Sequence, residues 1–228
     1  MTFTIYFNKD YMEWANVLIK SINIIEPTAI IAAHCINIKF EESKKLIEYS
    51  NTFVIEHDIK DIINVQMAWQ IIENKAKYLM ETIKLFPDDL HIMIDTDMML
   101  INPIDVLKSQ MKDFDMAGIR INKNKIAGGF LAVRPTAMSM NLLRKWSKYL
   151  LDDQVYYFNK DQPSLARYCE LYIAKGLKWL DVSRQYLDHL EKDDSMIWSA
   201  HKTEYGIKKE RIKKYKKKLE EMYENRSN

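Results

Sequence analysis

Two aspartates separated by one residue, Asp95 and Asp97, give the sequence its clearest chemical signal. They follow the apolar run His91-Ile92-Met93-Ile94, which is too short for a helix and predicts a buried strand. Carboxylates at the end of a strand can share one Mg²⁺ or Mn²⁺, because these cations prefer oxygen ligands and keep open positions for substrate phosphates. The pair therefore predicts metal-dependent handling of a phosphorylated ligand, and two solvated turn aspartates are the alternative.

Strands and helices alternate along the chain, which predicts an α/β fold with a mostly parallel sheet covered by helices on both faces. Short apolar runs predict strands at residues 4–7, 29–38, 52–55, 91–94, 116–121, 129–134, 177–182 and 196–200. Helical spacing of apolar residues predicts helices at 11–25, 41–49, 63–86, 103–109, 136–151, from Pro163 onward, and at 208–224. In open sheets of this kind, ligands bind beyond the carboxyl ends of the strands, where Asp95 and Asp97 are expected.

Composition indicates a globular protein: hydrophobic residues make up 47% and charged residues 29% of the 228 residues. The longest uncharged apolar stretch, residues 28–38, is too short to cross a bilayer, and no signal peptide is predicted. Cys35 and Cys169 lie far apart inside apolar patterns, which favours reduced packing residues over a disulfide or a metal pair. We therefore expect the protein in the cytoplasm, of a bacterium or of a virus-infected host cell.

The net charge of +2 conceals a basic end of the chain. Residues 207–228 contain nine Lys or Arg and four Asp or Glu, so the remaining residues carry a net charge of −3. The body is therefore not expected to bind nucleic acid. We predict one domain over residues 1–206 and a basic helical tail over 207–228, whose apolar stripe packs on the body. Weak contact of the tail's lysines with an anionic membrane surface is the alternative.

The turn after the first strand carries a second signal. Phe7 ends the strand, and Asn8-Lys9-Asp10-Tyr11 followed by Lys20-Ser21 closely resembles the opening of family 8 glycosyltransferases. In that family a D-x-N-Y turn holds the nucleotide base. The resemblance implies a GT-A fold and places Phe7, Asn8, Asp10 and Tyr11 at the donor. The polar side chains of this turn can hydrogen-bond to the edge of a uracil. Asn8 and Asp10 exchange the acid and the amide of the family's turn, and a simple helix cap is the alternative role of Asp10.

Further motifs follow in the order of the same family. Lys75-Ala76-Lys77-Tyr78 resembles its Y-A-R-L, which implies that Lys77 replaces the donor-binding arginine without the bidentate fork. Ile126-Ala127-Gly128-Gly129 resembles N-A-G-V, which implies that Ala127, Gly128 and Gly129 border the donor sugar, with Ile126 replacing a sugar-binding asparagine. Ser199-Ala200-His201-Lys202 resembles the H-x-x-G-x-x-K-P-W terminus, although the lysine is not in register, so Lys202, Lys208 and Lys209 all remain candidates for the diphosphate.

Asp161-Gln162 before Pro163 resembles the family's D-Q-x segment, and a purely structural N-cap at Asp161 is the alternative. The resemblance implies that Asp161 or Gln162 acts at the anomeric carbon. Asp161 suits an inverting base, whereas Gln162 suits a retaining mechanism, and the sequence leaves both open.

Taken together, the resemblance implies a metal-dependent transferase that moves a sugar from a nucleotide-diphospho-sugar, a UDP-sugar, to a glycan, glycoprotein or lipid-linked acceptor. It implies Mn²⁺ or Mg²⁺ held by Asp95, Asp97 and His201, and donor contacts from Asp95, Thr96 and Lys202. A strand followed by D-x-D also begins aspartyl-phosphate phosphatases, although these usually carry the motif near the start of the domain. A non-catalytic nucleotide-sugar-binding protein is the other alternative.

Overall fold

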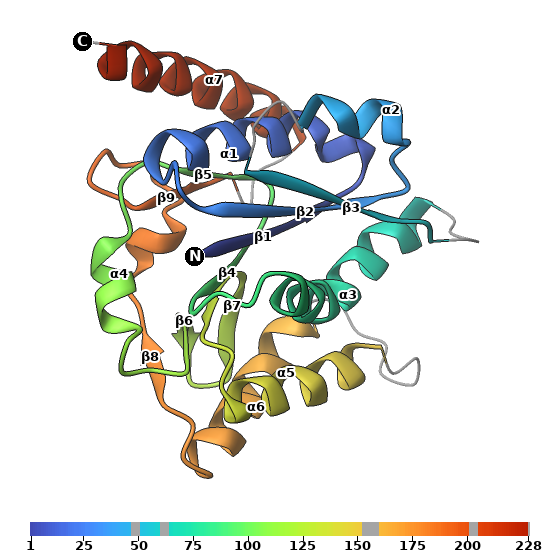
Figure 1. The fold of residues 1–228 in the computed structure, drawn as a ribbon, viewed down its shortest axis with the longest axis vertical. Coiled ribbons are helices and arrows are strands. Elements are labelled where there is room, and N and C mark those ends of the chain that lie inside the picture. The colour runs from blue at the N-terminus through green and yellow to red at the C-terminus, as the bar shows by residue number, and fades with distance from the viewer. Residues whose placement is uncertain (47–50, 60–63, 152–159, 201–204, 228) are drawn as a thin grey trace.

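A seven-stranded sheet forms the centre of the protein, in the strand order β3-β2-β1-β4-β7-β6-β8 (Figure 1). The computed structural model describes residues 1–46, 51–59, 64–151, 160–200 and 205–227. Only β7 runs antiparallel to its neighbours, so the predicted mostly parallel sheet is confirmed. The strands of this sheet are β1 (Thr2–Phe7), β2 (Ile30–Ile36), β3 (Thr52–His57), β4 (His91–Ile94), β6 (Met116–Asn122), β7 (Lys125–Val133) and β8 (Trp179–Asp181).

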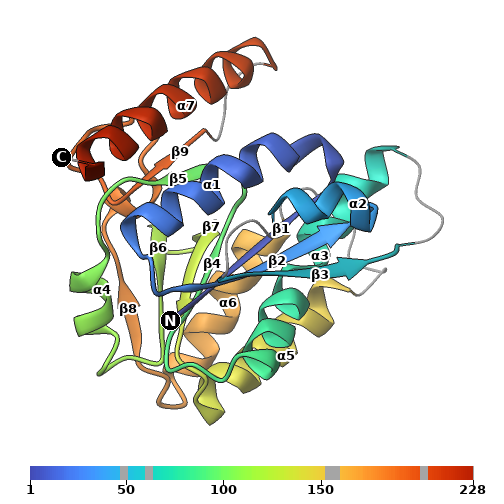
Figure 2. The ribbon, with the colours of Figure 1, turned by 45° about the horizontal axis from the view of Figure 1, so that its top comes forward.

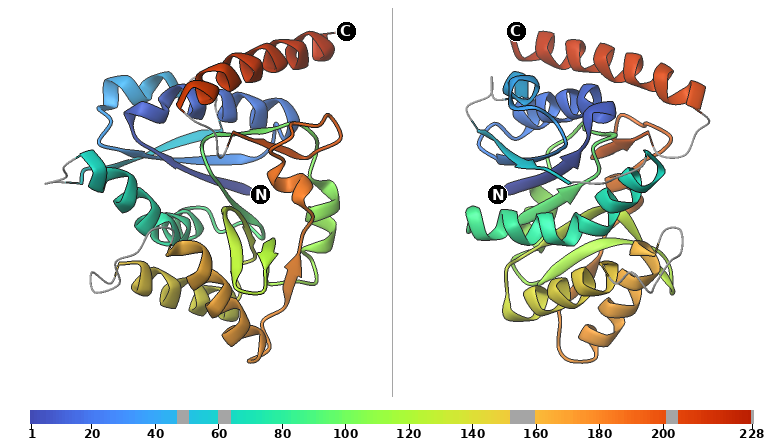
Figure 3. Two further views of the ribbon diagram at one scale, coloured as in Figure 1. Left: turned by 180° about the vertical axis from the view of Figure 1, so that it is seen from behind. Right: turned by 90° about the vertical axis from the view of Figure 1, so that its right-hand side faces the viewer.

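Helices cover both faces of the sheet, as Figures 2 and 3 show. One core includes Leu18 of α1 and Leu107 of α4, and the other includes Leu79 of α3, Leu143 of α5 and Leu165 of α6. The helices are α1 (Met12–Ile25), α2 (Phe40–Ser43), α3 (Asn64–Leu85), α4 (Asp105–Gln110), α5 (Ala137–Leu150), α6 (Asp161–Ile173) and α7 (Tyr205–Ser227), with 3-10 turns η1 (Lys9–Tyr11), η2 (Lys44–Leu46) and η3 (Arg184–Leu187). All six residues of β1 are buried because helices lie on both of its faces, as expected for a central parallel strand.

A second, two-stranded sheet pairs β5 (Met98–Leu100) antiparallel with β9 (Ile197–Ser199). The sequence analysis did not predict β5, since three residues are too few to show an alternating pattern. The pairing joins Met98 to Ser199 directly after the two aspartates. The backbone N–H of Ala200 then donates to the carbonyl oxygen of Asp97 at 3.0 Å. This two-stranded sheet, the β5–β9 ribbon, therefore brings the last third of the chain to the end of β4.

Two helix predictions need correction. The helix expected over 41–49 is divided at Lys44 into α2 and η2, and residues 47–50 lie outside the described ranges. The helix expected from Pro163 begins at Asp161, so Asp161 is a helical residue and not its N-cap. Pro163 is tolerated inside the first turn because the N–H groups of that turn have no partner within the helix.

The basic C-terminal helix α7 lies along the outer side of α1 and the β5–β9 ribbon (Figure 1). Tyr215 is fully buried, and its ring meets Trp14 edge-on at 5.5 Å and Trp198 at 5.8 Å between centroids. Ile212 and Leu219 are buried on the same stripe. The predicted packing of the tail on the body is therefore confirmed, although the helix begins at Tyr205, before the boundary expected at residue 207.

Acidic residues of the body pair with the basic side chains of α7. Lys218 contacts Asp193 at 2.9 Å, Lys216 pairs with Glu13, and Lys214 pairs with Glu191. The Glu191 side chain is largely buried, but the other side chains of these pairs are partly or fully exposed, and exposed pairs contribute little individually. The apolar stripe therefore supplies most of the attachment. Within the described ranges, the chain contains no helix with the length and apolar character needed to cross a membrane.

The packing of α7 can be tested through Tyr215. Replacing this buried ring, Tyr215→Ala, should lower the free energy of unfolding by about 3–5 kcal/mol, because burial of the ring is lost and a cavity remains. Lys217→Ala, on the exposed side of the same helix, should change it by less than about 0.5 kcal/mol. Urea denaturation of the full chain measures both. Equal midpoints for the two variants would contradict the packing described above.

Candidate functional site

The carboxyl ends of β1 and β4 lie side by side, since these strands pair in parallel. Two hydrogen bonds join them beyond the pairing. The hydroxyl of Thr96 donates to the carbonyl oxygen of Tyr6 at 2.7 Å, and the hydroxyl of Tyr6 donates to Asp95 Oδ1. The D-x-D turn is therefore fixed against the first strand, and the Asp95 carboxylate has a defined orientation.

Asp95 and Asp97 place two carboxylates in a poorly solvated position. Asp97 is buried, and Asp95 is partly buried. Burial raises the pKa of Asp95 to about 6; Asp97 and Asp161 add to the rise, while Lys75 opposes it. The rise means that removal from water and neighbouring negative charge both disfavour the ionised carboxylate. A cation bound at this position would relieve both effects.

Two glycines of β7 allow the backbone to approach these acids. A Cβ at Gly129 would lie 2.7 Å from Asp95 Oδ2, and one at Gly128 would overlap the Asp161 carboxylate. The backbone N–H of Asp95 also donates to the Gly129 carbonyl at 2.9 Å. Both positions therefore need glycine, because any side chain would displace a carboxylate of the site.

A buried ion pair closes the site on the side of α3 and α6. Lys75 Nζ lies 2.6 Å from Asp161 Oδ2 and 3.1 Å from the Gly128 carbonyl oxygen, and both side chains are at most 4% exposed. Burial lowers the pKa of Lys75, but the Asp161 and Asp95 carboxylates outweigh this and leave the pKa above its ordinary value. Lys75 is therefore charged, and it holds Asp161 in one orientation.

The predicted residues of the first turn lie at the mouth of this site with different exposures. Asn8 is buried, whereas Asp10 and Tyr11 are exposed on η1. The N-cap of α1 is Tyr11, so Asp10 is not the cap that the alternative reading expected. The Phe7 side chain is buried in the core, so only its backbone is available to a ligand.

The structure separates Lys77 from the carboxylates. Its side chain is 49% exposed, and its ammonium lies 4.0 Å from Glu81 on the same helix. Lys75, two residues earlier, is the lysine that reaches Asp161. Among the other predicted residues, Ala127 is buried in β7 and Gln162 is partly buried beside Asp161. His201 and Lys202 lie outside the described residues, and the described backbone reaches Asp97 at Ala200.

Sequence reasoning missed Tyr6 and Lys75. The helical repeat could have identified Lys75, because Tyr78, Leu79 and Thr82 follow it at positions i+3, i+4 and i+7 and are all buried. Lys77 shares its helix face with Glu81 and Lys84 instead. No comparable signal existed for Tyr6, because every residue of β1 is buried.

Comparison with known proteins identifies the family and the fold of the chain. The model of the family described as nucleotide-diphospho-sugar transferase matches residues 85–221, and no curated protein sequence matches the chain. Several solved structures share its fold, among them three glycosyltransferases. They are the glycosyltransferase GlyE of Streptococcus pneumoniae TIGR4 (TM-score 0.63, 11% identity, 98% of this chain and 63% of GlyE), the galactosyltransferase LgtC in complex with donor and acceptor sugar analogues (0.62, 10%, 97% and 96%), and a glycosyltransferase involved in glycosylation of the major capsid of PBCV-1 (0.61, 10%, 93% and 99%).

The fold is thus that of the GT-A glycosyltransferases, with an acidic site at the carboxyl end of its central strands. The family model covers more than half of the sequence, and the chain belongs to the nucleotide-diphospho-sugar transferase family. It spans less than two thirds of the length of GlyE and nearly the full length of LgtC.

Lys75 provides a test of the site's construction. Lys75→Met leaves Asp161 buried without its partner, so it should lower the free energy of unfolding by about 3–5 kcal/mol. Lys77→Met removes only a half-exposed contact and should change it by less than about 0.5 kcal/mol. Urea denaturation compares the two variants. The assignment of Lys75 to the buried pair fails if the Lys77 variant is the less stable one.

Proposed function

We propose that the protein is a divalent-metal-dependent glycosyltransferase that uses a UDP-sugar as donor. Family membership supplies the donor class, a nucleotide-diphospho-sugar. The observation that carries the proposal is that Asp97 and Asp161 both lie close enough to Asp95 to interact with its charge, while Lys75 is paired with Asp161. A divalent cation bound to Asp95 would offset the repulsion among these carboxylates, and its open positions would take the phosphates of the donor.

The chemistry of these side chains fits Mn²⁺ or Mg²⁺. Asp95 and Asp97 offer hard carboxylate oxygens, and the pKa of Asp95 is raised mainly by burial, with a further contribution from Asp97. We assign the metal to Asp95, Asp97 and His201, the last following Ala200 along the chain. Such an ion would neutralise the charge that develops on the diphosphate as the sugar leaves.

The turn after β1 is the proposed site of the nucleotide base. The first turn resembles the uridine-binding turn of family 8 enzymes, and this resemblance supports UDP. Exposed Asp10 and Tyr11 are accessible to a base, and buried Asn8 lies beside them. Lys202 is the proposed diphosphate contact, with Lys208 and Lys209 as the other candidates. Thr96 and the backbone from Ala127 to Gly129 would border the ribose and the sugar.

Asp161 is the proposed group at the anomeric carbon. Lys75 binds one of its carboxylate oxygens. The other carboxylate oxygen can accept the proton of an acceptor hydroxyl, while the hydroxyl oxygen bonds to the anomeric carbon and the diphosphate leaves. Gln162, in the same helical turn, would serve instead if the reaction retains the anomeric configuration. Lys77 could contact the donor only from outside the carboxylate cluster, and its role is the least supported of these assignments.

The acceptor is proposed to be a glycan, a glycoprotein or a lipid-linked sugar. A cytoplasmic location, where nucleotide sugars are made, suits this activity. Membrane contact through the exposed side of α7 stays a prediction. Several basic side chains of the helix pair with the body, which leaves fewer of them to contact a membrane.

Turnover of nucleotide sugars tests the proposal. With Mn²⁺ present, UDP-sugars should yield UDP faster than GDP-, CMP- or dTDP-sugars yield their nucleotides, and excess EDTA should abolish the reaction. Asp97→Ala should lower the rate at least about a hundredfold, through loss of the carboxylate that holds the charge-neutralising ion. Luminescent detection of released UDP measures this. Binding of UDP-sugar without turnover would identify a non-catalytic binding protein, and full activity in EDTA would exclude the metal.

The role of the α6 turn has its own test. Asp161→Asn or Gln162→Ala should lower kcat at least about a hundredfold, as expected for loss of a group that acts on the reacting atoms. Asp105→Asn is the matched control, an aspartate in the first turn of α4 away from the site. Steady-state kinetics on variants with native circular dichroism spectra decides the matter. If both α6 variants keep most of their kcat, neither residue acts at the anomeric carbon.

A further inference from the structure

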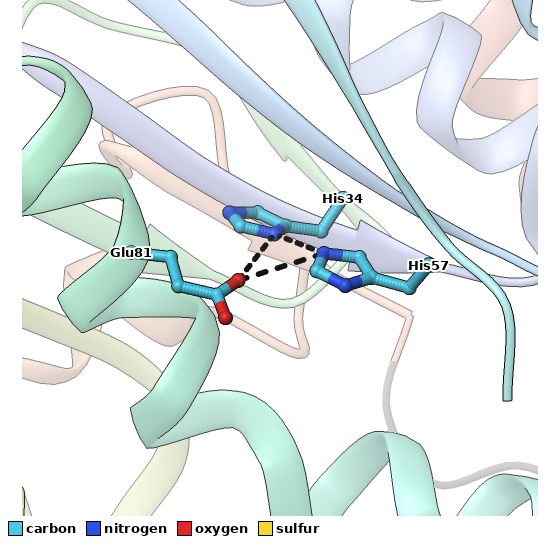
Figure 4. Close-up of side chains that lie close together, drawn as sticks. All are labelled: His34, His57 and Glu81. Atoms are coloured by element: carbon cyan, nitrogen blue, oxygen red, sulfur yellow. Dashed lines mark hydrogen bonds and ion pairs between the residues drawn. The ribbon is translucent and has the colours of Figure 1, made fainter.

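A second cluster of ligand-type side chains lies on the α3 side of the sheet, on its outer strands (Figure 4). His34 comes from β2, His57 from the end of β3, and Glu81 from α3. His34 Nδ1 lies 2.7 Å from His57 Nε2, and Glu81 Oε2 lies 3.9 Å and 3.7 Å from these two nitrogens. In the described part of the chain, no other group of three His, Cys, Asp or Glu side chains comes as close together.

Thr82 fixes the orientation of the buried ring. His34 is fully buried, and its Nε2 lies 2.8 Å from the Thr82 hydroxyl. When the Nε2–H donates to the Thr82 hydroxyl, Nδ1 carries the free lone pair and faces His57 and Glu81. Metal-binding histidines are typically held in this way, by a hydrogen bond from the ring nitrogen that does not bind the metal. Burial lowers the pKa of His34 to about 3, so the ring is neutral.

The dimensions of the cluster suit a small tetrahedral ion. Zinc bonds of about 2.0–2.2 Å place neighbouring ligand atoms about 3.3 Å apart. The contact between the two histidines must therefore widen, and the contacts to Glu81 must shorten, each by roughly half an ångström. His57 can make the adjustment because it ends β3 and its side chain is 15% exposed. Two imidazoles and one carboxylate form a zinc ligand set with an open position, and they suit Mg²⁺ poorly.

The cluster also has access to solvent. His57 lines a pocket of about 430 Å³ together with Lys77 and Tyr78. Glu56 and Asp58 line the same pocket and add negative charge at its wall. Lys77 contacts the other oxygen of Glu81, at 4.0 Å, so Oε2 remains directed at the histidines. An ion in the pocket can therefore meet His57 directly, and the partly exposed Glu81 lies beside it.

We propose that His34, His57 and Glu81 form a binding site for zinc or a similar first-row transition metal. The site is separate from the carboxylates at the end of β4 and takes a different class of ion. Its ligands come from two strands and one helix, so the ion would tie β2 and β3 to α3. Because α3 also carries Lys75, the ion would steady the helix that holds Asp161.

Titration of the tag-free, metal-free full chain with zinc chloride tests the proposal. Asp97→Ala is used as the background, so that zinc at the carboxylate site does not contribute. Calorimetry should detect a bound zinc ion, and zinc should raise the melting temperature, because it binds the folded state. Mg²⁺ in excess should not displace it. Both cysteines are free and buried, so they do not compete in the folded chain.

Variants of the cluster complete the experiment. His57→Ala and Glu81→Gln should each weaken zinc binding more than tenfold, and Thr82→Val, which removes only the supporting hydroxyl, by about tenfold. Glu56→Gln is the matched control, a carboxylate of the same pocket outside the cluster, and should leave the affinity unchanged.

The proposal is overturned if zinc binds the Asp97→Ala chain no more tightly than the same chain with His57→Ala added. It is also overturned if Glu56→Gln weakens zinc binding as much as Glu81→Gln. Should His57→Ala fail to fold, Glu81→Gln on the surface of α3 decides alone. Neither result bears on sugar transfer with Mn²⁺, which depends on other residues.

Discussion

The buried ion pair between Lys75 and Asp161 is the constraint around which the candidate site is arranged. It joins three elements at one point, because Lys75 extends from α3, Asp161 opens α6, and the Gly128 carbonyl of β7 accepts from the same ammonium. Charges this well buried require a close partner, since desolvation is otherwise strongly unfavourable. The pair therefore fixes where α3 and α6 sit against the sheet, and Gly128 of β7 is needed to leave room for it.

The order of strands and helices was predictable because burial of one face spaces apolar residues differently along a strand and along a helix. Long amphipathic segments such as α5 repeat over several turns, and the structure has it at Ala137–Leu150 as predicted within a residue at each end. The short strand β5 was not predicted, because it contains too few residues to show such a repeat. The three residues of β5 are buried through pairing with β9, a partner almost a hundred residues away, which no local pattern encodes. Pro163 marked the start of α6 only approximately, because proline fits several positions of a first turn.

Residues of the candidate site were predictable where both the residue type and its place next to a strand indicated a role in binding. Asp95, Asp97 and the two glycines are recognisable in the sequence, and the structure brings them together with Asp161. The lysine that pairs with Asp161 was not predicted, because matching the family motif selected Lys77 as a donor contact, and a shift of two residues turns a helical side chain by about 200°. Tyr6 could not be found at all, since its role depends on a hydrogen bond from its hydroxyl to Asp95, 89 residues away.

The C-terminal helix covers an aromatic surface that the rest of the chain does not cover. Trp14 and Trp198 lie beneath Tyr215, and β9, which carries Trp198, leads directly to the residue that bonds the Asp97 backbone. A protein shortened at residue 206 would present these rings to water as a contiguous apolar patch, a feature that promotes self-association. By covering Trp14 and Trp198, α7 therefore removes an apolar surface through which copies of the protein could associate.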